Sequence, residues 1–167
     1  MTQEERRQMI ESYGAAYDRL VEAIGALPRR MWTYRPASGE WTIHEILIHI
    51  ADSEANSFIR ARRFIAEPGS TVMAYDQDLW AVRLDYHNRN IEEALALFRE
   101  LRRSTYSLVR SLPESTWSNT VSHPENGVMS MDDWLRIYEA HVPGHIAQMQ
   151  RVHDAWLQAA APEEAGA

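Results

Sequence analysis

Apolar residues recur three or four positions apart along most of the chain, and this spacing predicts long α-helices rather than strands. The first helix is expected over residues 4–27, where aromatic and aliphatic side chains share one face. The second is expected over residues 43–66, because Thr42 and Glu45 form a capping box at its start and Pro68 follows its end.

Two more helices follow the same pattern in the second half of the chain. Asn90 is placed to cap a helix that runs to residue 112, directly before a proline. Ser130 and Asp133 form another capping box, which opens a helix that reaches about residue 157.

The segments between these helices carry turn residues and little periodicity. Residues 68–89 form a long connection, within which a short helix is expected over residues 76–84, and residues 118–129 favour a short hairpin or an ordered loop. Four long helices with this connection predict an all-α fold, a four-helix bundle with a long crossover between the second and third helices. We expect one domain over residues 1–158 and a flexible tail over residues 159–167.

The composition is that of an ordinary globular protein, with 45% hydrophobic and 25% charged residues among 167. There is no cysteine, which excludes a disulfide framework, a thiolate nucleophile and any cysteine-based zinc site. The net charge of −7 argues against nucleic acid and anionic membranes as partners. The first residues form no apolar leader and no run is long enough to span a membrane, so we expect a cytoplasmic protein.

Two histidines fall on the apolar face of the last predicted helix. His141 and His145 lie one turn apart near the middle of that face, so both rings can reach one metal ion. The structural alternative is two buried histidines bonded to backbone groups or tyrosine hydroxyls, and the spacing alone leaves both readings open. His49, on the flank of the second helix, is a weaker ligand candidate. Asp52, one turn later, is placed to accept a hydrogen bond from an imidazole.

The other histidines show no metal-binding pattern. His44 and His49 are five residues apart and point in different directions, so they do not form the helical zinc-protease motif. His141 and His145 have the spacing of that motif, but Val142 stands where it requires a glutamate. We expect no ligand role for His44, His87, His123 and His153.

Two segments together carry a family resemblance. Residues 41–54 read Trp-Thr-Ile-His-Glu-Ile-Leu-Ile-His-Ile-Ala-Asp-Ser-Glu, and residues 139–149 read Glu-Ala-His-Val-Pro-Gly-His-Ile-Ala-Gln-Met. With them the chain resembles, over nearly its whole length, the DinB/YfiT-like superfamily of metal-binding four-helix bundles. Residues 74–80 also resemble the crossover of one branch of that superfamily.

The resemblance implies a divalent-metal site at His49, His141 and His145, with the remaining coordination positions open to water or substrate. Zinc, nickel or iron is the expected ion. Characterised members of the superfamily include enzymes that use low-molecular-weight thiols such as bacillithiol, mycothiol or glutathione. The resemblance therefore implies a metal-dependent transferase or isomerase that acts on a small molecule with such a thiol as cosubstrate.

Three other functions remain open at this point. The chain could be a metal-dependent hydrolase, a metal-binding stress or sensor module without turnover, or a structural bundle whose histidines are polar core groups. Five further residues are candidates for the surroundings of the ion or for a substrate pocket: Asp52, Glu54, Asp76, Tyr138 and Gln148. For Glu54, Asp76 and Tyr138 the alternative is solvation or a structural hydrogen bond, and for Trp80 and Trp134 as pocket walls it is core packing.

Aromatic residues in the expected loops suggest an interface. Trp32, Tyr34 and Trp117 fall outside the predicted long helices, where their side chains would be partly exposed. Bundles of the superfamily that the chain resembles often pair through helix faces, and with these aromatic residues we expect a homodimer.

Overall fold

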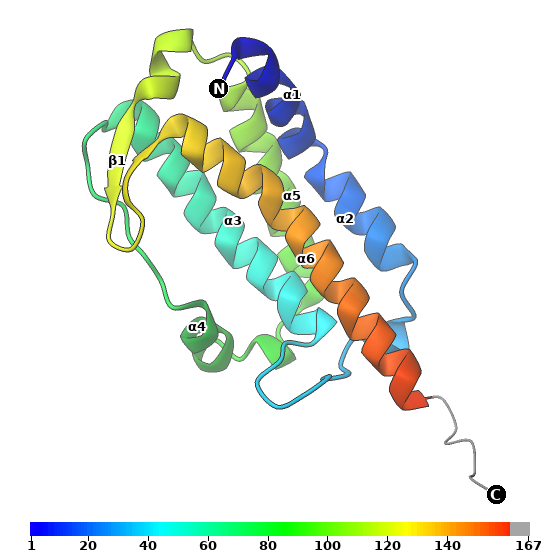
Figure 1. Cartoon of the computed structure of the whole chain (residues 1–167). Coiled ribbons are helices and arrows are strands. Elements are labelled where there is room, and N and C mark those ends of the chain that lie inside the picture. The colour runs from blue at the N-terminus through cyan, green and yellow to red at the C-terminus, as the bar shows by residue number, and fades with distance from the viewer. Residues whose placement is uncertain (161–167) are drawn as a thin grey trace, which may run out of the picture.

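Long helices lie side by side in the structure, a computed structural model that describes residues 1–160 (Figure 1). The long elements are α1 (Gln3–Gly14), α2 (Ala16–Gly25), α3 (Ile43–Ala66), α5 (Ile91–Val109) and α6 (Met131–Ala160). Because α1 and α2 follow one another along the same edge, these elements form the four-helix bundle that the periodicity predicts. The tail expected over residues 159–167 falls mostly outside the described residues, and its first two residues belong to α6.

The predicted caps fix where α3 and α6 begin. The Glu45 amide donates to Thr42 Oγ1 at 3.2 Å, and the Thr42 amide donates to a Glu45 carboxylate oxygen at 2.8 Å. Ser130 and Asp133 exchange the same pair of bonds, at 3.2 and 2.9 Å. Each box satisfies two amides that a helix start would otherwise leave unpaired, so both starting points are confirmed.

The first predicted helix is interrupted, which the periodicity did not indicate. Ala15 separates α1 from α2, and the break follows Gly14, a poor helix former. A side chain at Gly14 would place its Cβ 2.7 Å from the ring of Tyr106, on α5. The glycine therefore permits α5 to pack closely against this edge of the bundle.

The buried face of α6 is turned relative to the apolar face that the sequence predicts. On α6, Ile137 is 43% exposed, whereas Val142 is fully buried. The buried face points between α3 and the α1–α2 edge, because α6 packs against all three helices. His141 and His145 therefore lie half-buried at the border of that face rather than at its middle.

The loop aromatics also differ from expectation. Trp32 and Trp117 are 5% and 3% exposed and belong to the core, so the expectation of partly exposed rings is wrong for both, and Tyr34 is half-buried. Trp32 belongs to one of the two apolar clusters, against which Tyr34 packs, and Trp117 belongs to the other. The homodimer stays a prediction without these rings to support it. Trp134 is likewise a core residue, whose indole nitrogen donates to the Ser57 carbonyl at 3.3 Å.

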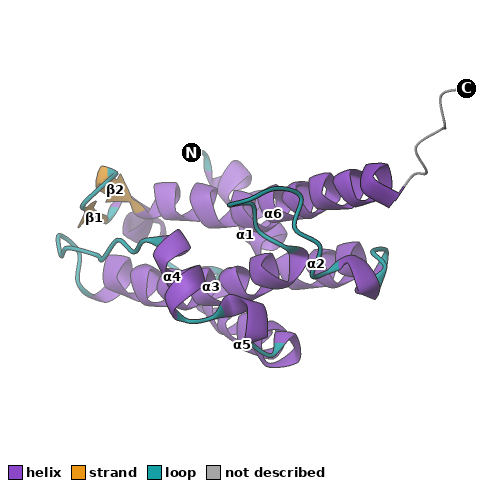
Figure 2. Ribbon diagram, turned by 90° about the horizontal axis from the view of Figure 1, so that it is seen from below, coloured by secondary structure: helices purple, strands orange, loops and turns teal. Residues whose placement is uncertain are grey.

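The crossover contains the expected short helix, α4 (Gln77–Arg83), which Asp76 caps by accepting from the Leu79 amide at 2.9 Å. A 3₁₀ turn, η2 (Tyr86–Asn88), leads from α4 into α5. Figure 2 shows α4 lying in front of α3, away from the packed interior. The crossover thus folds back and covers one side of α3, the helix that it directly follows.

The hairpin expected near residues 118–129 is present as β1 (Thr120–His123) and β2 (Gly127–Ser130), an antiparallel pair. A bridge between Thr71 and Ser122 attaches the crossover to it.

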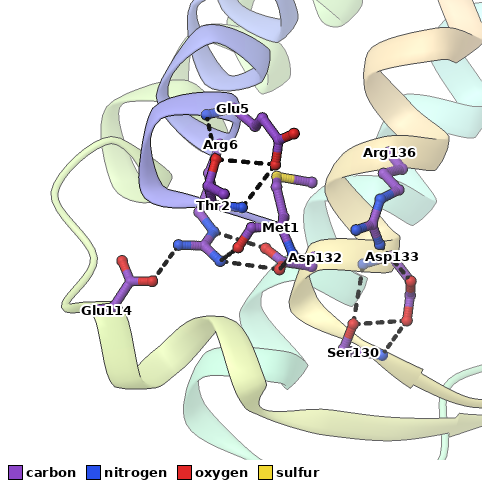
Figure 3. Close-up of polar contacts among 9 residues, drawn as sticks. All are labelled: Met1, Thr2, Glu5, Arg6, Glu114, Ser130, Asp132, Asp133 and Arg136. Carbon is purple, nitrogen blue, oxygen red and sulfur yellow. Dashed lines mark hydrogen bonds and ion pairs between the residues drawn. The ribbon is translucent and has the colours of Figure 1, made fainter.

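The N-terminus is anchored at the same end of the bundle (Figure 3). Arg6 donates from Nε and Nη2 to the two carboxylate oxygens of Asp132, at 2.7 and 3.0 Å, and it also contacts Glu114. This bidentate pair joins α1 to the first turn of α6. None of the helices within residues 1–160 has the length and apolar character needed to cross a bilayer.

Candidate metal centre

Three histidines converge between α3 and α6. His49 lies on α3, and His141 and His145 lie one turn apart on α6. One ring nitrogen of each histidine lies within 4.8 Å of the corresponding nitrogens of the other two. The ring centroids are 4.5 to 5.4 Å apart. Within residues 1–160 no second group of three ligand-type side chains has this spacing.

The spacing of the two α6 histidines suits a shared ion. His141 Nε2 and His145 Nε2 are 3.2 Å apart. Two metal–nitrogen bonds of about 2.0–2.1 Å at a tetrahedral angle place the nitrogens about 3.3 Å apart. An ion between the two rings would therefore need little movement of α6.

A hydrogen bond to Gln148 fixes the orientation of the His145 ring. Its Nδ1 lies 2.8 Å from Gln148 Oε1, an oxygen that can only accept, so Nδ1 carries the proton and donates it. Nε2 then keeps the lone pair that a metal ion requires, and it is the nitrogen that faces His141. Gln148, expected near the site, lies in contact with a candidate ligand.

His49, unlike the other two histidines, has no polar partner within residues 1–160. Its side chain is 1% exposed, and among the described residues neither Nδ1 nor Nε2 finds a hydrogen-bond partner. The ring of Trp41 covers one side at a centroid distance of 4.8 Å. Leaving such a group unsatisfied costs about 1–3 kcal/mol. A divalent ion would satisfy it, so these residues fit a metal site.

Burial keeps the three imidazoles neutral. Desolvation, reinforced by the neighbouring His145, lowers the pKa of His49 to about 3. Desolvation and the two other histidines lower the pKa of His141 to about 2, and desolvation also lowers the pKa of His145. All three rings therefore keep lone pairs at neutral pH, which is the ligand state of histidine.

Further polar side chains lie next to the histidines. Ser53, one turn after His49, places Oγ 3.3 Å from His141 Nε2. Tyr138 has its ring 6.2 Å from that of His141, and its hydroxyl accepts a hydrogen bond from Arg60 at 2.8 Å. Burial raises the pKa of Tyr138 to about 12, so its hydroxyl stays protonated. The Ser53 hydroxyl therefore lies closest to the metal-facing side of His141.

Two carboxylates have other partners than expected. Asp52 accepts from the Tyr86 hydroxyl at 2.6 Å and bonds to no imidazole, so its predicted contact with a histidine is wrong. The side chain leaves α3 on the side of the crossover, where Tyr86 is buried. Glu54 forms a buried, bidentate ion pair with Arg102, at 3.0 and 2.6 Å, and also accepts from the Tyr13 hydroxyl. Glu54 therefore forms structural hydrogen bonds, which was the alternative to a role near the ion.

The remaining candidates and histidines lie apart from the centre. Asp76 is exposed and caps α4, and Trp80 packs against Tyr75 at 4.6 Å. His44 Nε2 lies 2.9 Å from the Arg89 carbonyl oxygen. His123 is buried and accepts two backbone amides at Nδ1. Neither these two histidines nor His87 and His153 belong to the cluster.

A pocket of about 180 Å³ opens beside His145. Its lining comes from the loop before α3, from the start of α4 and from α6: Gly39, Glu40, Trp41, Gln77, Asp78, His145 and Gln148. The periodicity identified none of the loop and α4 residues as part of a site, because they lie outside the long helices. Trp41 carried a signal, since it directly precedes the capping box of α3.

Comparisons with known proteins identify the family of this chain. The family model of the DinB superfamily matches residues 12–161. A protein of Oceanobacillus iheyensis, named as a candidate metal-dependent hydrolase, is 36% identical over 67% of this chain and 64% of its own length. YfiT of Bacillus subtilis, with the same kind of name, is 29% identical over 66% of this chain and 63% of its own length. The matched part of the chain thus spans less than two thirds of either relative.

Two solved structures share the fold. The structure of Bacillus subtilis YfiT, described as a probable metal-dependent hydrolase with an unusual four-helix bundle topology, superposes with a TM-score of 0.85 at 23% identity. The alignment covers 93% of this chain and 90% of that one. A mycothiol-dependent maleylpyruvate isomerase superposes with a TM-score of 0.68 at 13% identity, over 95% of this chain and 67% of that one. At these identities the likeness concerns the fold.

Proposed function

This chain belongs to the DinB superfamily, and we propose that it is a divalent-metal-dependent enzyme that acts on a small molecule. The observation that carries the proposal is His49, whose two buried, unpartnered nitrogens lie beside His141 and His145. A purely structural pair or triad of histidines would be hydrogen-bonded within the protein. The names of the relatives as metal-dependent proteins support the same reading.

Three neutral imidazoles would hold the ion and leave part of its coordination sphere free, as in catalytic rather than structural metal sites. Imidazole ligands suit zinc, nickel and iron. A bound ion would lower the pKa of a thiol or a water molecule beside it and so supply a nucleophile at neutral pH. The Gln148 side chain holds the His145 ring, and the pocket beside His145 admits the substrate.

We favour a low-molecular-weight thiol as the nucleophile, in a transferase or isomerase reaction. A thiol needs no separate general base once its pKa is lowered, whereas water activation is commonly assisted by a nearby carboxylate. The two carboxylates on α3 near the centre are already engaged, Asp52 by Tyr86 and Glu54 by Arg102, so a base for water would have to come from the pocket lining. The fold shared with a mycothiol-dependent isomerase gives this choice further support.

A metal-dependent hydrolase is the second candidate, since two relatives carry that name. In that case water would take the place of the thiol. Glu40 and Asp78, which line the pocket next to His145, would be the carboxylates available to accept its proton.

One set of assays separates these functions. Protein loaded with zinc, nickel or iron is incubated with cysteine or glutathione and 1-chloro-2,4-dinitrobenzene, and separately with 4-nitrophenyl acetate. The proposal expects metal-dependent conjugation, in which sulfur replaces chloride on the aromatic ring and the thiol proton goes to solvent. Metal-dependent ester hydrolysis without conjugation would favour the hydrolase. Metal binding without either activity would contradict the proposal of an enzyme and would favour a metal-binding module without turnover.

Histidine variants test the site itself. His49→Ala, His141→Ala and His145→Ala should each weaken metal binding by more than the 10- to 100-fold typical of a residue that only orients a ligand. His44→Ala and His153→Ala should leave it unchanged, because both lie outside the cluster. Equal effects of His49→Ala and His44→Ala would remove His49 from the site.

A further inference from the structure

The pocket beside the metal centre continues into a second hollow. The second hollow, of about 470 Å³, shares Gly39, Trp41 and Asp78 with the first. Its other lining residues come from the loop before α3, from α3 itself, and from α4 and the turn after it: Arg35, Glu45, Ala81, Val82, Asp85 and His87. The two hollows adjoin at the three residues that they share, and we call them together the groove; His145 lines its inner hollow. A molecule bound at the histidines would extend along this groove.

The wall of this groove carries unpaired negative charge. Glu40, Asp78 and Asp85 are exposed, and none of them forms an ion pair within residues 1–160. The fourth carboxylate, Glu45, is paired with Arg35, the one arginine in the lining. Glu40 and Asp78 are the two that line the inner hollow together with His145.

Trp41 adds an aromatic surface between the two hollows. Its half-buried ring packs on His49 at 4.8 Å and lies 6.5 Å from Tyr86, and it lines both hollows. None of the arginines within residues 1–160 stacks over it, although arginines lie over the rings of Trp32, Trp117 and Trp156. A tryptophan face beside carboxylates is a combination that binds ammonium groups.

We propose that this groove selects substrates that carry an ammonium group beside the atom bound at the three histidines. The inference rests on the proposed function and names its substrate class: a small molecule with a thiol or similar donor atom and a neighbouring primary or quaternary amine. Glu40 and Asp78 offset the repulsion between that amine and a divalent ion. At the inner end, His145 lines the hollow, and its ring lies 4.9 Å from that of the buried His49, whose nitrogens have no partner within residues 1–160.

The carboxylates do not make a second metal site. A metal site of this kind needs at least three ligand side chains close together, and the described residues contain one such group, the three histidines. An organic cation, in contrast, can be held by two carboxylates and one aromatic face.

Binding of small thiols to the cobalt(II)-loaded protein tests the proposal without an activity assay. The visible absorption of cobalt reports loading, and the sulfur-to-cobalt charge-transfer band reports binding of cysteamine, 2-mercaptoethanol or 3-mercaptopropionate. Cysteamine should bind more tightly than 2-mercaptoethanol, and 3-mercaptopropionate more weakly than either. The affinity for cysteamine should exceed that for 2-mercaptoethanol about two- to tenfold, the size expected of two exposed ion pairs. This ratio should shrink as salt is raised to about 1 M.

The thiols also differ in their own affinity for cobalt, so the ratio of their affinities is compared between the wild type and variants. In Glu40→Gln/Asp78→Asn the ratio of cysteamine to 2-mercaptoethanol affinity should fall toward the ratio for free cobalt. In Asp18→Asn/Glu22→Gln, which removes the same charge from the exposed face of α2, it should stay at the wild-type value. An unchanged ratio in the groove variant, or no preference in the wild type, would overturn the inference alone. Failure of the wild type to bind cobalt would overturn the proposed function as well.

Discussion

Each histidine of the centre has its chemical state set by its immediate neighbours. Gln148 determines which nitrogen of His145 is protonated, and burial keeps His49 and His141 neutral. A side chain that only orients a ligand commonly changes metal affinity by about 10- to 100-fold when it is removed. Gln148 is such a residue, since it contacts Nδ1 of His145, whereas Nε2 faces His141.

We therefore predict that Gln148→Ala weakens zinc binding about 10- to 100-fold, as measured by competition with a chromophoric chelator. Gln150→Ala is the matched control, because Gln150 is exposed on the same helix and bonds to Asp154 instead. The control should bind zinc like the wild type. Equal affinities in the two variants would mean that Gln148 does not hold the His145 ring.

Glu54 makes a different prediction, because its carboxylate belongs to the core. Glu54→Gln leaves the Arg102 charge buried without its partner, and such a loss commonly costs about 3–5 kcal/mol. Chemical denaturation should show this loss, while zinc affinity stays at the wild-type value. Glu100→Gln, which breaks only exposed ion pairs, should show no comparable change. A stable Glu54→Gln protein with impaired zinc binding would return Glu54 to the metal site.

Side chains on regular helices were predictable from the sequence, and side chains whose partners come from loops were not. Spacing alone brought His141 and His145 together, and the family resemblance added His49. The partner of Asp52 could not be found in this way, because Tyr86 enters from the crossover at a distance of 34 residues. Glu40 and Asp78 meet at the pocket for the same reason, from two segments whose packing no periodicity encodes.

At the scale of elements, helix starts followed from local chemistry, but the interruption between α1 and α2 did not. A capping box lies within four residues, so its sequence specifies it. The break at Ala15 depends on Gly14 and on Tyr106, which arrives from α5. The shifted buried face of α6 has a similar origin, since it depends on which helices α6 packs against.

Because Gly14 contacts Tyr106, we predict that Gly14→Ala changes the stability of the wild type and of Tyr106→Ala in opposite directions. Alanine favours a helix by about 1 kcal/mol over glycine, whereas overpacking costs about 1–3 kcal/mol. Gly14→Ala should therefore destabilise the wild type, because its Cβ would lie 2.7 Å from the Tyr106 ring. In the Tyr106→Ala background the same change should stabilise the protein. Denaturation midpoints of the four proteins check this, and equal shifts in both backgrounds would rule out the contact.

At the scale of the whole molecule, the metal centre couples stability to pH. Unfolded histidines titrate near pH 6.5, whereas burial lowers the pKa of folded His49 to about 3 and of His141 to about 2. The unfolded state therefore binds more protons below about pH 6.5, and the metal-free protein should lose stability as the pH falls from there. In the folded protein, protons compete with a metal for these two rings only near their lowered pKa values.

The increase in melting temperature on zinc binding should accordingly persist from about pH 7 to about pH 5 and fade only toward about pH 3. Thermal melting of zinc-loaded and chelator-treated protein at each pH measures it, and the chelator-treated sample controls for acid unfolding. An increase that has already vanished at about pH 5 would show that the imidazoles titrate normally and are not buried as described.

The central claim is that His49, His141 and His145 bind one divalent ion. Anomalous X-ray diffraction from crystals of the protein purified without added metal tests it most directly. The account predicts one strong peak about 2.0–2.2 Å from a ring nitrogen of each of the three histidines, with at least one further position occupied by solvent or another small ligand. Crystals of metal-supplemented protein that show no peak between these rings, or a peak that His49 does not contact, would contradict it.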